Sequence, residues 1–243
     1  MELQTHTPPI TAPAEVDAQL RAQGHAVLDL QTLPRPMADA LGRWQAFWAR
    51  LPSDQHLRDG GRYRRRRHGC FIADGESLQP VPHRAHWQPV QYNALHGGIE
   101  RWFEPLEPAL ASDPAWRELL LSLGHHASAL RGQRPWYVEA HCFRIDTTDG
   151  IGRPTPEGAH RDGVDLVAVM LLSRHGVKGG ETRVFDVRSP QGQRFTMTAP
   201  GTTLLLDDAR VIHETTPIQP LQDGSGHRDT LVLTYRAGGF QSA

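Results

Sequence analysis

After Arg131 the sequence consists of short apolar or β-branched runs separated by turn-forming residues. The runs include WYVEAHCFRID, VDLVAVMLL, TRVFDV, QRFTMTA, TTLLLDD and DTLVLTYRA, and the turns include GRPTPEG, RSPQG and DGSG. Short runs joined by Gly- and Pro-rich turns are typical of strands in closed or double-sheet β architectures. This half of the chain therefore predicts a jelly roll over about residues 131–240.

The first half has the spacing of amphipathic helices. In PRPMADALGRWQAFWARL, large apolar side chains such as Trp44 and Trp48 recur at helical intervals. GIERWFEPLEPALASDPAWRELLLSL predicts a second helical region, which restarts with Asp113 as a cap and Pro114 in the first turn. We therefore expect helices to pack against the jelly roll.

These patterns predict the fold class and the domain organisation. We expect a mainly β protein with flanking helices (α+β), in which residues 21–243 form a single domain with a helical N-terminal half packed on the jelly roll. Residues 1–20 are rich in Thr and Pro and are expected to form a mobile tail.

Composition narrows the classes of function. A net charge of −1 at pH 7 does not favour a nucleic-acid or membrane partner for the whole surface. Cys70 and Cys142 are too few for a disulfide framework, and no apolar run is long enough to span a membrane. The N-terminus lacks the basic head and apolar core of a signal peptide. We expect a cytoplasmic protein that acts on a small-molecule substrate; the sequence does not determine its oligomeric state.

The tripeptide His-Arg-Asp occurs at 160–162 and again at 227–229. With 14 histidines and 27 acidic residues in 243 positions, between one and two His-x-acid pairs are expected by chance, so the motif alone proves nothing. Its context separates the two copies, because His160 and Asp162 follow a turn and precede a strongly apolar strand. Residues two apart share a face of a strand, so these two side chains can point together.

His213 supplies a third candidate ligand, just beyond the apolar strand TTLLLDD. Several strands separate Asp162 from His213, enough for the chain to circle a small β barrel and return alongside. Two imidazoles and one carboxylate on one face of an ion leave coordination positions open, which is the facial triad of non-haem Fe(II) oxygenases. Taken singly, His160 is equally consistent with a surface loop, and His213 with a strand end bonded to a carbonyl.

The second copy of the tripeptide indicates a different role. In HRDTLVLTY, Arg228 and Thr230 share a strand face, while His227 and Asp229 point the other way and are not expected to bind metal. A guanidinium beside a hydroxyl is a good receptor for a carboxylate. A 2-oxoglutarate molecule that chelates iron through its keto-acid end still has a far carboxylate to satisfy. Arg228 and Thr230 are the predicted 2-oxoglutarate-binding residues, although an arginine on an exposed edge strand fits the same pattern.

At these residues the sequence resembles the bacterial 2-oxoglutarate/Fe(II)-dependent dioxygenases that include the free L-isoleucine hydroxylases. The matching stretches are RYRRRRH, PVPHRAHWQPVQYNALHGGIERWFEPL, HCFRID, PTPEGAHRDGVDLVAVMLLSRHGVKGGETRVFD, TLLLDDARVIHETTPI and HRDTLVLTYR, together spanning about residues 60–236. The resemblance implies a double-stranded β-helix of the cupin-like type. It also implies Fe(II) held by His160, Asp162 and His213, 2-oxoglutarate anchored by Arg228, O₂ as oxidant, and hydroxylation of a free aliphatic L-amino acid.

The residues that bind the substrate are less well defined by the sequence. Tyr92 and Asn93 lie in a stretch that resembles the wall of the family's active site, although Tyr92 is equally consistent with core packing. Glu181 follows a Gly-Gly turn and is a candidate to orient a metal ligand, although a solvated glutamate at a strand end fits the pattern equally well. Arg144 and His141 lie on opposite faces of one strand, so only one of them can face the site. Asp207 and Asp208 fit ordinary turn chemistry.

Two alternative functions remain at this point. A cupin-like metal protein with other chemistry, such as an isomerase, would share the fold and the ligands but would not produce succinate. A non-catalytic binding module could use the run Arg62–Arg67, which reads RYRRRR. In an extended segment Arg62, Arg64 and Arg66 would share a face, and one of them could instead bind a substrate carboxylate inside the site.

Overall fold

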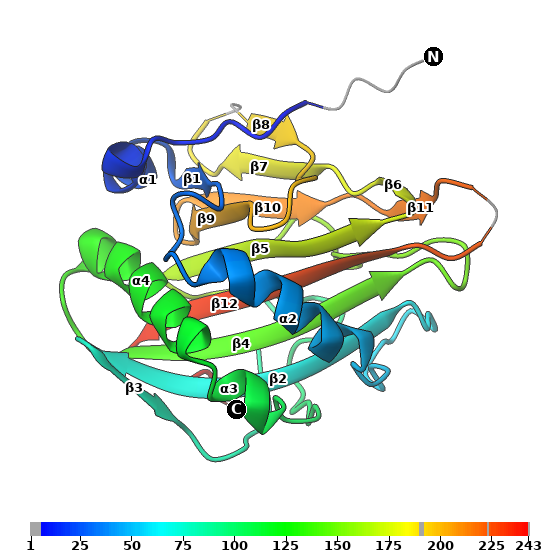
Figure 1. Cartoon of the computed structure of the whole chain (residues 1–243), viewed down its shortest axis with the longest axis horizontal. Coiled ribbons are helices and arrows are strands. Elements are labelled where there is room, and N and C mark those ends of the chain that lie inside the picture. Colours follow the sequence, from blue (N-terminus) through cyan, green and yellow to red (C-terminus); the bar gives the residue numbers. More distant parts are fainter. Residues whose placement is uncertain (1–5, 190–191, 223, 243) are drawn as a thin grey trace.

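Strands dominate the computed structural model, which describes residues 6–189, 192–222 and 224–242 (Figure 1). Within these residues the largest sheet has seven strands in the order β1-β9-β5-β12-β4-β2-β3, and all neighbours are antiparallel. In that order the strands are β1 (His25–Leu28), β9 (Thr203–Asp207), β5 (Leu166–His175), β12 (His227–Ala237), β4 (Trp136–Asp146), β2 (Arg64–Asp74) and β3 (Ser77–Pro80).

Two smaller sheets complete the β structure of the described chain, in the orders β10-β7-β8 and β11-β6. Their strands are β6 (Val177–Gly179), β7 (Thr182–Asp186), β8 (Gly192–Phe195), β10 (Val211–Thr215) and β11 (Ile218–Pro220). Val184 and Phe195 of the first small sheet share a buried apolar cluster with Leu204 of β9 and Leu171 of β5. Two antiparallel sheets that face each other across a core form a jelly roll, as the sequence predicts.

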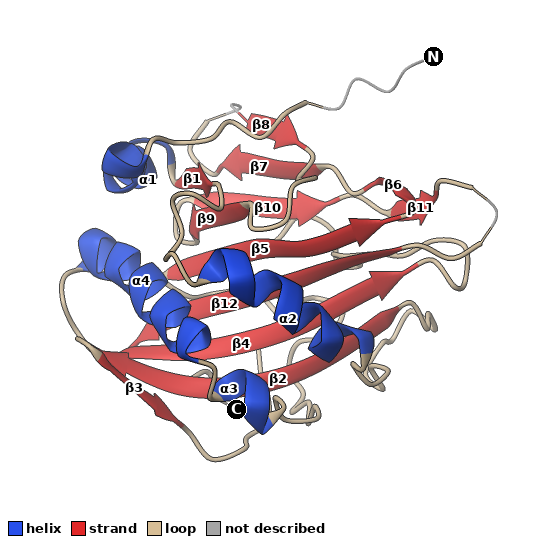
Figure 2. Cartoon of the chain, viewed as in Figure 1, coloured by secondary structure: helices blue, strands red, loops and turns tan. Residues whose placement is uncertain are grey.

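Helices cover the outer face of the large sheet (Figure 2). The helical segments are the 3₁₀ helix η1 (Pro13–Glu15) and the α-helices α1 (Val16–Gln23), α2 (Met37–Ala49), α3 (Pro108–Ala111) and α4 (Pro114–Arg131). Trp44 of α2 packs edge-on against Trp116 of α4, with ring centroids 5.6 Å apart. The indole N–H of Trp48 donates to the carbonyls of Phe143 and Thr230, each at 3.1 Å. Helix α2 therefore ties together β4 and β12, two adjacent strands of the large sheet.

Helix α4 begins as the sequence predicts. The Asp113 carboxylate caps the helix by accepting from the backbone N–H of Ala115 at 2.9 Å, and Pro114 occupies the first turn, where no N–H is needed. No helix in the described ranges is both long and apolar enough to cross a membrane.

The N-terminal part of the chain differs from the prediction in two ways. The expected tail over residues 1–20 is too long, because Val16 and Leu20 of α1 are buried in the main core. Residues 1–5 lie outside the described chain. The N-terminal half is also not purely helical, since β1, β2 and β3 join the large sheet. The Thr- and Pro-rich composition of residues 1–20 favours a loop. The i, i+4 spacing of Val16 and Leu20, which places both on one helix face, indicates the helix instead.

Alternation along β12 gives its two faces different roles. Leu231, Leu233 and Tyr235 point into the core beneath the helices. Arg228 and Thr230 point to the other side, where a cavity separates the large sheet from β10. The period of two in a strand thus places Arg228 and Thr230 of β12 in the cavity and its large apolar side chains against the helices.

Candidate active site

An open cavity of about 120 Å³ lies between the two facing sheets. Its walls come from β2, β4 and β12 on one side and from β10 on the other. Two connecting segments complete it, residues 86–101 before α3 and residues 154–164 before β5. The polar side chains that line the cavity come mostly from these two segments and from the cavity-facing positions of the strands.

The predicted metal ligands converge on this cavity. His160 and His213 are joined by two backbone hydrogen bonds of 3.0 Å, which bring the segment before β5 beside β10. The Asp162 carboxylate lies 3.8 Å from Nε2 of each histidine, Oδ1 facing His160 and Oδ2 facing His213. All three ligand atoms lie within 4.8 Å of one another. Two imidazoles and one carboxylate at these separations can bind one ion from a single side.

Asp208 holds the turn that carries Asp162. Its carboxylate accepts backbone N–H groups from Asp162, Gly163 and Val164 at 2.9, 2.7 and 3.0 Å. Burial and the neighbouring Asp162 raise the pKa of Asp208 to about 7. From the sequence, Asp208 is interpreted as an ordinary turn residue. In the structure it also fixes the backbone of residues 162–164, which lie far away along the chain and include the metal-ligand candidate Asp162.

Gln88 orients the ligand carboxylate itself. Its side-chain amide donates to Asp162 Oδ1 at 3.1 Å, and its carbonyl oxygen accepts from Asn93 at 3.2 Å and from Arg101 at 3.0 Å. Asn93, a predicted substrate residue, thus lines the cavity but acts on Gln88. Tyr92 lies instead beneath the guanidinium of Arg161, 5.8 Å from its ring centroid, outside the cavity lining.

Glu157 brings a second carboxylate close to the ligands. Its Oε1 lies 3.5 Å from Nε2 of His160, and its Oε2 is buried without a hydrogen-bond partner in the described residues. No spacing pattern marks Glu157 as a site residue, although it lies three positions before His160 in PTPEGAH.

Arg228 and Thr230 face the cavity together, as their spacing predicts. Arg228 is 3 % exposed, and its Nε and one terminal nitrogen find no partner in the described chain. Burial lowers the pKa of Arg228 to about 10, aided by Arg174. A buried guanidinium without a counterion is costly unless an anion joins it. Together with the triad, this orphaned cation is the arrangement that an iron ion and a chelating dicarboxylate would fill.

Comparison with known proteins agrees with this geometry. The family model described as 2OG-Fe dioxygenase matches residues 45–234. The chain belongs to this family. Its members use Fe(II), 2-oxoglutarate and O₂, so the protein is a 2-oxoglutarate-dependent dioxygenase.

Solved structures extend the comparison over the whole dioxygenase. A bsmA homologue from Methylobium petroleophilum is 53% identical over 100% of this chain and 99% of its own, with a TM-score of 0.90. IDO from Bacillus thuringiensis is 16% identical, with coverages of 98% and 99% and a TM-score of 0.76. The Fe(II)/α-ketoglutarate-dependent dioxygenase TqaL is 21% identical, with coverages of 95% and 90% and a TM-score of 0.70. The last two likenesses show the shared fold. Among curated proteins, none matches the chain.

Two other predicted substrate residues lie away from the cavity of the dioxygenase. Arg144 donates twice to the carboxylate of Asp229, at 2.7 Å each, on the face of β4 opposite the cavity. His141, one of the two alternatives on that strand, is the residue that faces the cavity. Glu181 pairs with Arg183 at 2.8 Å and does not line the cavity. We therefore leave Arg144 and Glu181 out of the proposed site.

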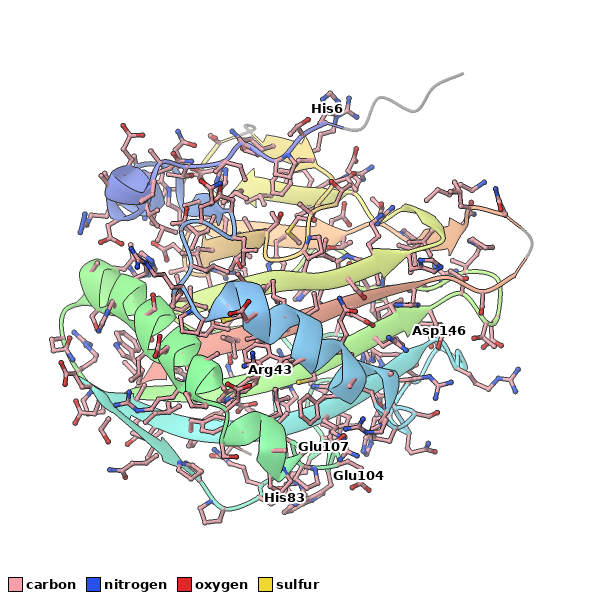
Figure 3. The ribbon with its side chains drawn as sticks, in the orientation of Figure 1. His6, Arg43, His83, Glu104, Glu107 and Asp146 are labelled. Atoms are coloured by element: carbon pink, nitrogen blue, oxygen red, sulfur yellow. The ribbon has the colours of Figure 1, made fainter. Side chains whose placement is uncertain are left out.

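The arginines of the run Arg62–Arg67 form ion pairs and line the cavity of the dioxygenase. Arg62 pairs with Asp149 at 3.0 Å, and Arg65 pairs with Asp146, which Figure 3 shows at the end of β4. Arg64 and Arg66 alternate with these and face the cavity, buried. The run therefore contributes to the wall of the cavity as well as to surface ion pairs.

A second cluster of histidines reaches the cavity of the dioxygenase through His86 and His141. Glu139 Oε2 accepts from His68 at 3.0 Å and from His86 at 2.5 Å, and His141 Nε2 lies 3.7 Å away. Burial lowers the pKa of His86 to about 4 and lowers those of His68 and His141 as well, so the three imidazoles are neutral near pH 7. Burial alone would raise the pKa of Glu139, but His86 and His68 hold it well below its usual range.

Sequence reasoning did not predict this second cluster. Register brings it together, because His68 of β2 lies directly opposite His141 of β4. His86 is added by a two-way backbone pairing with Arg101, at 2.9 Å in each direction. The pairing of strands cannot be derived from one sequence. The sequence indicates only that Glu139 and His141, two residues apart on one strand, share a face of the sheet.

Proposed function

We propose that His160, Asp162 and His213 hold Fe(II), that Arg228 and Thr230 bind the far carboxylate of 2-oxoglutarate, and that the enzyme hydroxylates a free aliphatic L-amino acid. The observation that carries the proposal is the convergence of the triad and an orphaned buried arginine on one cavity. The amino-acid substrate class is supported by the sequence resemblance over residues 60–236. The free thiols of Cys70 and Cys142 fit a reducing compartment such as the cytoplasm.

The residues of the chain divide the work of catalysis among them. When bound, Fe(II) with O₂ and 2-oxoglutarate supplies the oxidant that inserts one oxygen atom into a C–H bond, with release of succinate and CO₂. Arg228 neutralises the carboxylate that does not reach the metal. Gln88 and Asp208 fix Asp162, so the open side of the triad faces the cavity. Val169 and Val232 line the cavity and give it apolar surface against which an aliphatic side chain can pack.

Turnover against a panel of free amino acids tests the proposal. Protein loaded anaerobically with Fe(II) receives 2-oxoglutarate, O₂ and each amino acid, and succinate and +16 Da products are measured by mass spectrometry. We expect succinate and hydroxylated product with at least one aliphatic L-amino acid. Asp162→Ala should abolish both, whereas Glu181→Gln, which alters a carboxylate outside the cavity, should not. Succinate at background for every amino acid would rule out this substrate class.

The two alternative functions make different predictions in the same assay. A cupin-like isomerase would turn over substrate without forming succinate. A binding module that used the arginine run would show salt-dependent nucleic-acid binding that survives His160→Ala. The pairing of Arg62 and Arg65 with Asp149 and Asp146 gives that second reading little support.

A further inference from the structure

On the wall formed by β4 and residues 86–101, two buried side chains of opposite charge interact at a distance but form no direct ion pair with a Lys, Arg, Asp or Glu of the described residues. Arg101 is 2% exposed and Glu139 is 6% exposed, and both line the cavity that contains the metal triad. Isolated buried charges are costly, so a pair of opposite sign that does not form its own ion pair points to a ligand that satisfies both.

Arg101 makes a single side-chain hydrogen bond in the described chain, from one terminal nitrogen to Gln88 at 3.0 Å. Its Nε is buried and unpartnered, and no carboxylate of the described residues forms an ion pair with it. Arg64 and Arg66 of the arginine run each keep one buried nitrogen without a partner, but both lie near the Asp54 carboxylate, at 2.7 and 4.0 Å. Arg101 is thus the arginine of this wall that has no carboxylate of the described residues within ion-pair distance.

Glu139 is the matching anion. Its Oε2 takes the N–H groups of His68 and His86, whereas its Oε1 accepts no hydrogen bond from the described residues. Neither Lys nor Arg in those ranges forms an ion pair with it. The surrounding imidazoles orient the carboxylate by hydrogen bonds without cancelling its charge.

The same histidines could in principle hold a second metal ion, because four ligand atoms of this cluster lie within 4.8 Å of one another. The hydrogen bond from Arg66 argues against that reading. A guanidinium can only donate, so Nδ1 of His141 accepts, and the ring proton then lies on Nε2, the atom that faces Glu139. A protonated nitrogen has no lone pair for a metal.

We propose that Glu139 receives the α-ammonium group and Arg101 the α-carboxylate of the amino-acid substrate. The inference rests on the proposed function and adds the recognition of both charged ends of the substrate. A free amino acid carries these two charges on one carbon, so a single molecule can neutralise both groups. Gln88 joins Arg101 to Asp162 through two hydrogen bonds, which places this wall next to the metal ligands.

Calorimetric binding to the anaerobic protein with Fe(II) and 2-oxoglutarate tests the inference without turnover. The ligands are the best amino-acid substrate, the same skeleton without its amine, and the methyl ester of the amino acid. The variants are Glu139→Gln, Arg101→Met and the control Glu181→Gln. An iron content of one per chain in each variant shows that the triad is intact.

Wild-type protein should bind the amino acid about 100-fold more tightly than either analogue. Glu139→Gln should weaken binding of the amino acid about 100-fold and change binding of the des-amino acid less than about threefold. Arg101→Met should weaken binding of the amino acid and the des-amino acid, and change binding of the ester little. The control should bind like the wild type.

Equal weakening of all three ligands by either variant, or no weakening, would overturn the inference. A second divalent ion in wild-type protein that Glu139→Gln removes would overturn it too, and would assign the cluster to a metal. These results are distinguishable from failure of the proposed function. If no amino acid yields succinate, the substrate class fails; if one does and both variants bind it normally, only the present inference fails.

Discussion

Two clusters of histidines, one around Asp162 and one around Glu139, contribute side chains to the same cavity, and they hold their carboxylates in different ways. Asp162 stays 3.8 Å from the nearest nitrogens of His160 and His213 and takes its side-chain hydrogen bond from Gln88. Glu139 accepts N–H groups directly from His68 and His86 at 3.0 and 2.5 Å. The first arrangement leaves lone pairs directed at a shared space, whereas the second uses them within the protein.

This difference shows why residue types alone do not define a metal centre. Histidine and acid occur in both clusters, yet an ion can bind only where the ligands are not already bonded to one another. An outside donor to the carboxylate, here Gln88, is what keeps Asp162 apart from its histidines. A neighbouring guanidinium, Arg66, fixes the tautomer of His141 in the other cluster.

The largest expected effect separates the clusters by iron content. Asp162→Ala should lower succinate formation more than about 1000-fold and leave the protein with far less than one iron per chain. Glu139→Gln should retain one iron per chain. The iron content of the two purified variants and their rates of succinate formation measure this difference. Loss of iron from Glu139→Gln would contradict the assignment of the metal to the first cluster alone.

The second effect is the pH dependence of stability. His86 has a pKa of about 4 in the folded protein and 6.5 when unfolded, so only the unfolded chain takes up its proton between these values. Wild-type stability should therefore fall as pH drops from 6.5 to 4, by up to about 3 kcal/mol from this group. Urea unfolding of metal-free wild type and His86→Gln across this range should show the gap between them narrowing. A constant gap would mean that His86 titrates normally.

The third effect concerns the arginine beside each cluster. Arg228→Met should raise the KM for 2-oxoglutarate about 100-fold, because the far carboxylate loses its charged partner, and leave the affinity for the amino acid nearly unchanged. Arg101→Met should do the reverse. Steady-state kinetics with each substrate varied in turn gives the KM for 2-oxoglutarate and for the amino acid. A rise in both KM values for either variant would show that the two arginines do not bind separate substrates.

The smallest effect tests the outside donor. Gln88→Leu removes the hydrogen bond to Asp162 while keeping a similar volume, and should weaken Fe(II) binding about 10-fold. Gln88→Glu, whose carboxylate cannot donate when ionised, should weaken it as well. Fluorescence titration with Fe(II) under anaerobic conditions gives the dissociation constants, and an unchanged value in both variants would show that Asp162 needs no such support.

The sequence predicted features that lie in one segment or follow from periodicity. Strand β4 coincides with the apolar run WYVEAHCFRID, and Asp113 caps helix α4 as predicted. Arg228 and Thr230 lie on one face of β12, as their spacing predicts. Convergence of His213 with His160 required a fold hypothesis in addition to spacing.

Features that depend on register or on long loops escaped prediction. His68 and His141 lie opposite each other only because β2 pairs with β4 in this register, and the hydrophobic pattern does not specify that pairing. Arg101 and Gln88 come from a segment with little regular structure, so no periodicity marked them. Val16 and Leu20 show the reverse error, a short helix hidden in a stretch whose composition favours a loop.

The two-sided character of β12 restricts how this enzyme can change over evolutionary time. A one-residue insertion or deletion inside the strand would reverse the facing of the residues on one side of the change, and so turn either Leu231 and Leu233 into the cavity or Arg228 toward the helical layer. Point substitutions can remodel either surface separately, but the length of the strand is fixed. New specificities should therefore arise by exchange of side chains along β12, while changes in length accumulate in the connecting loops.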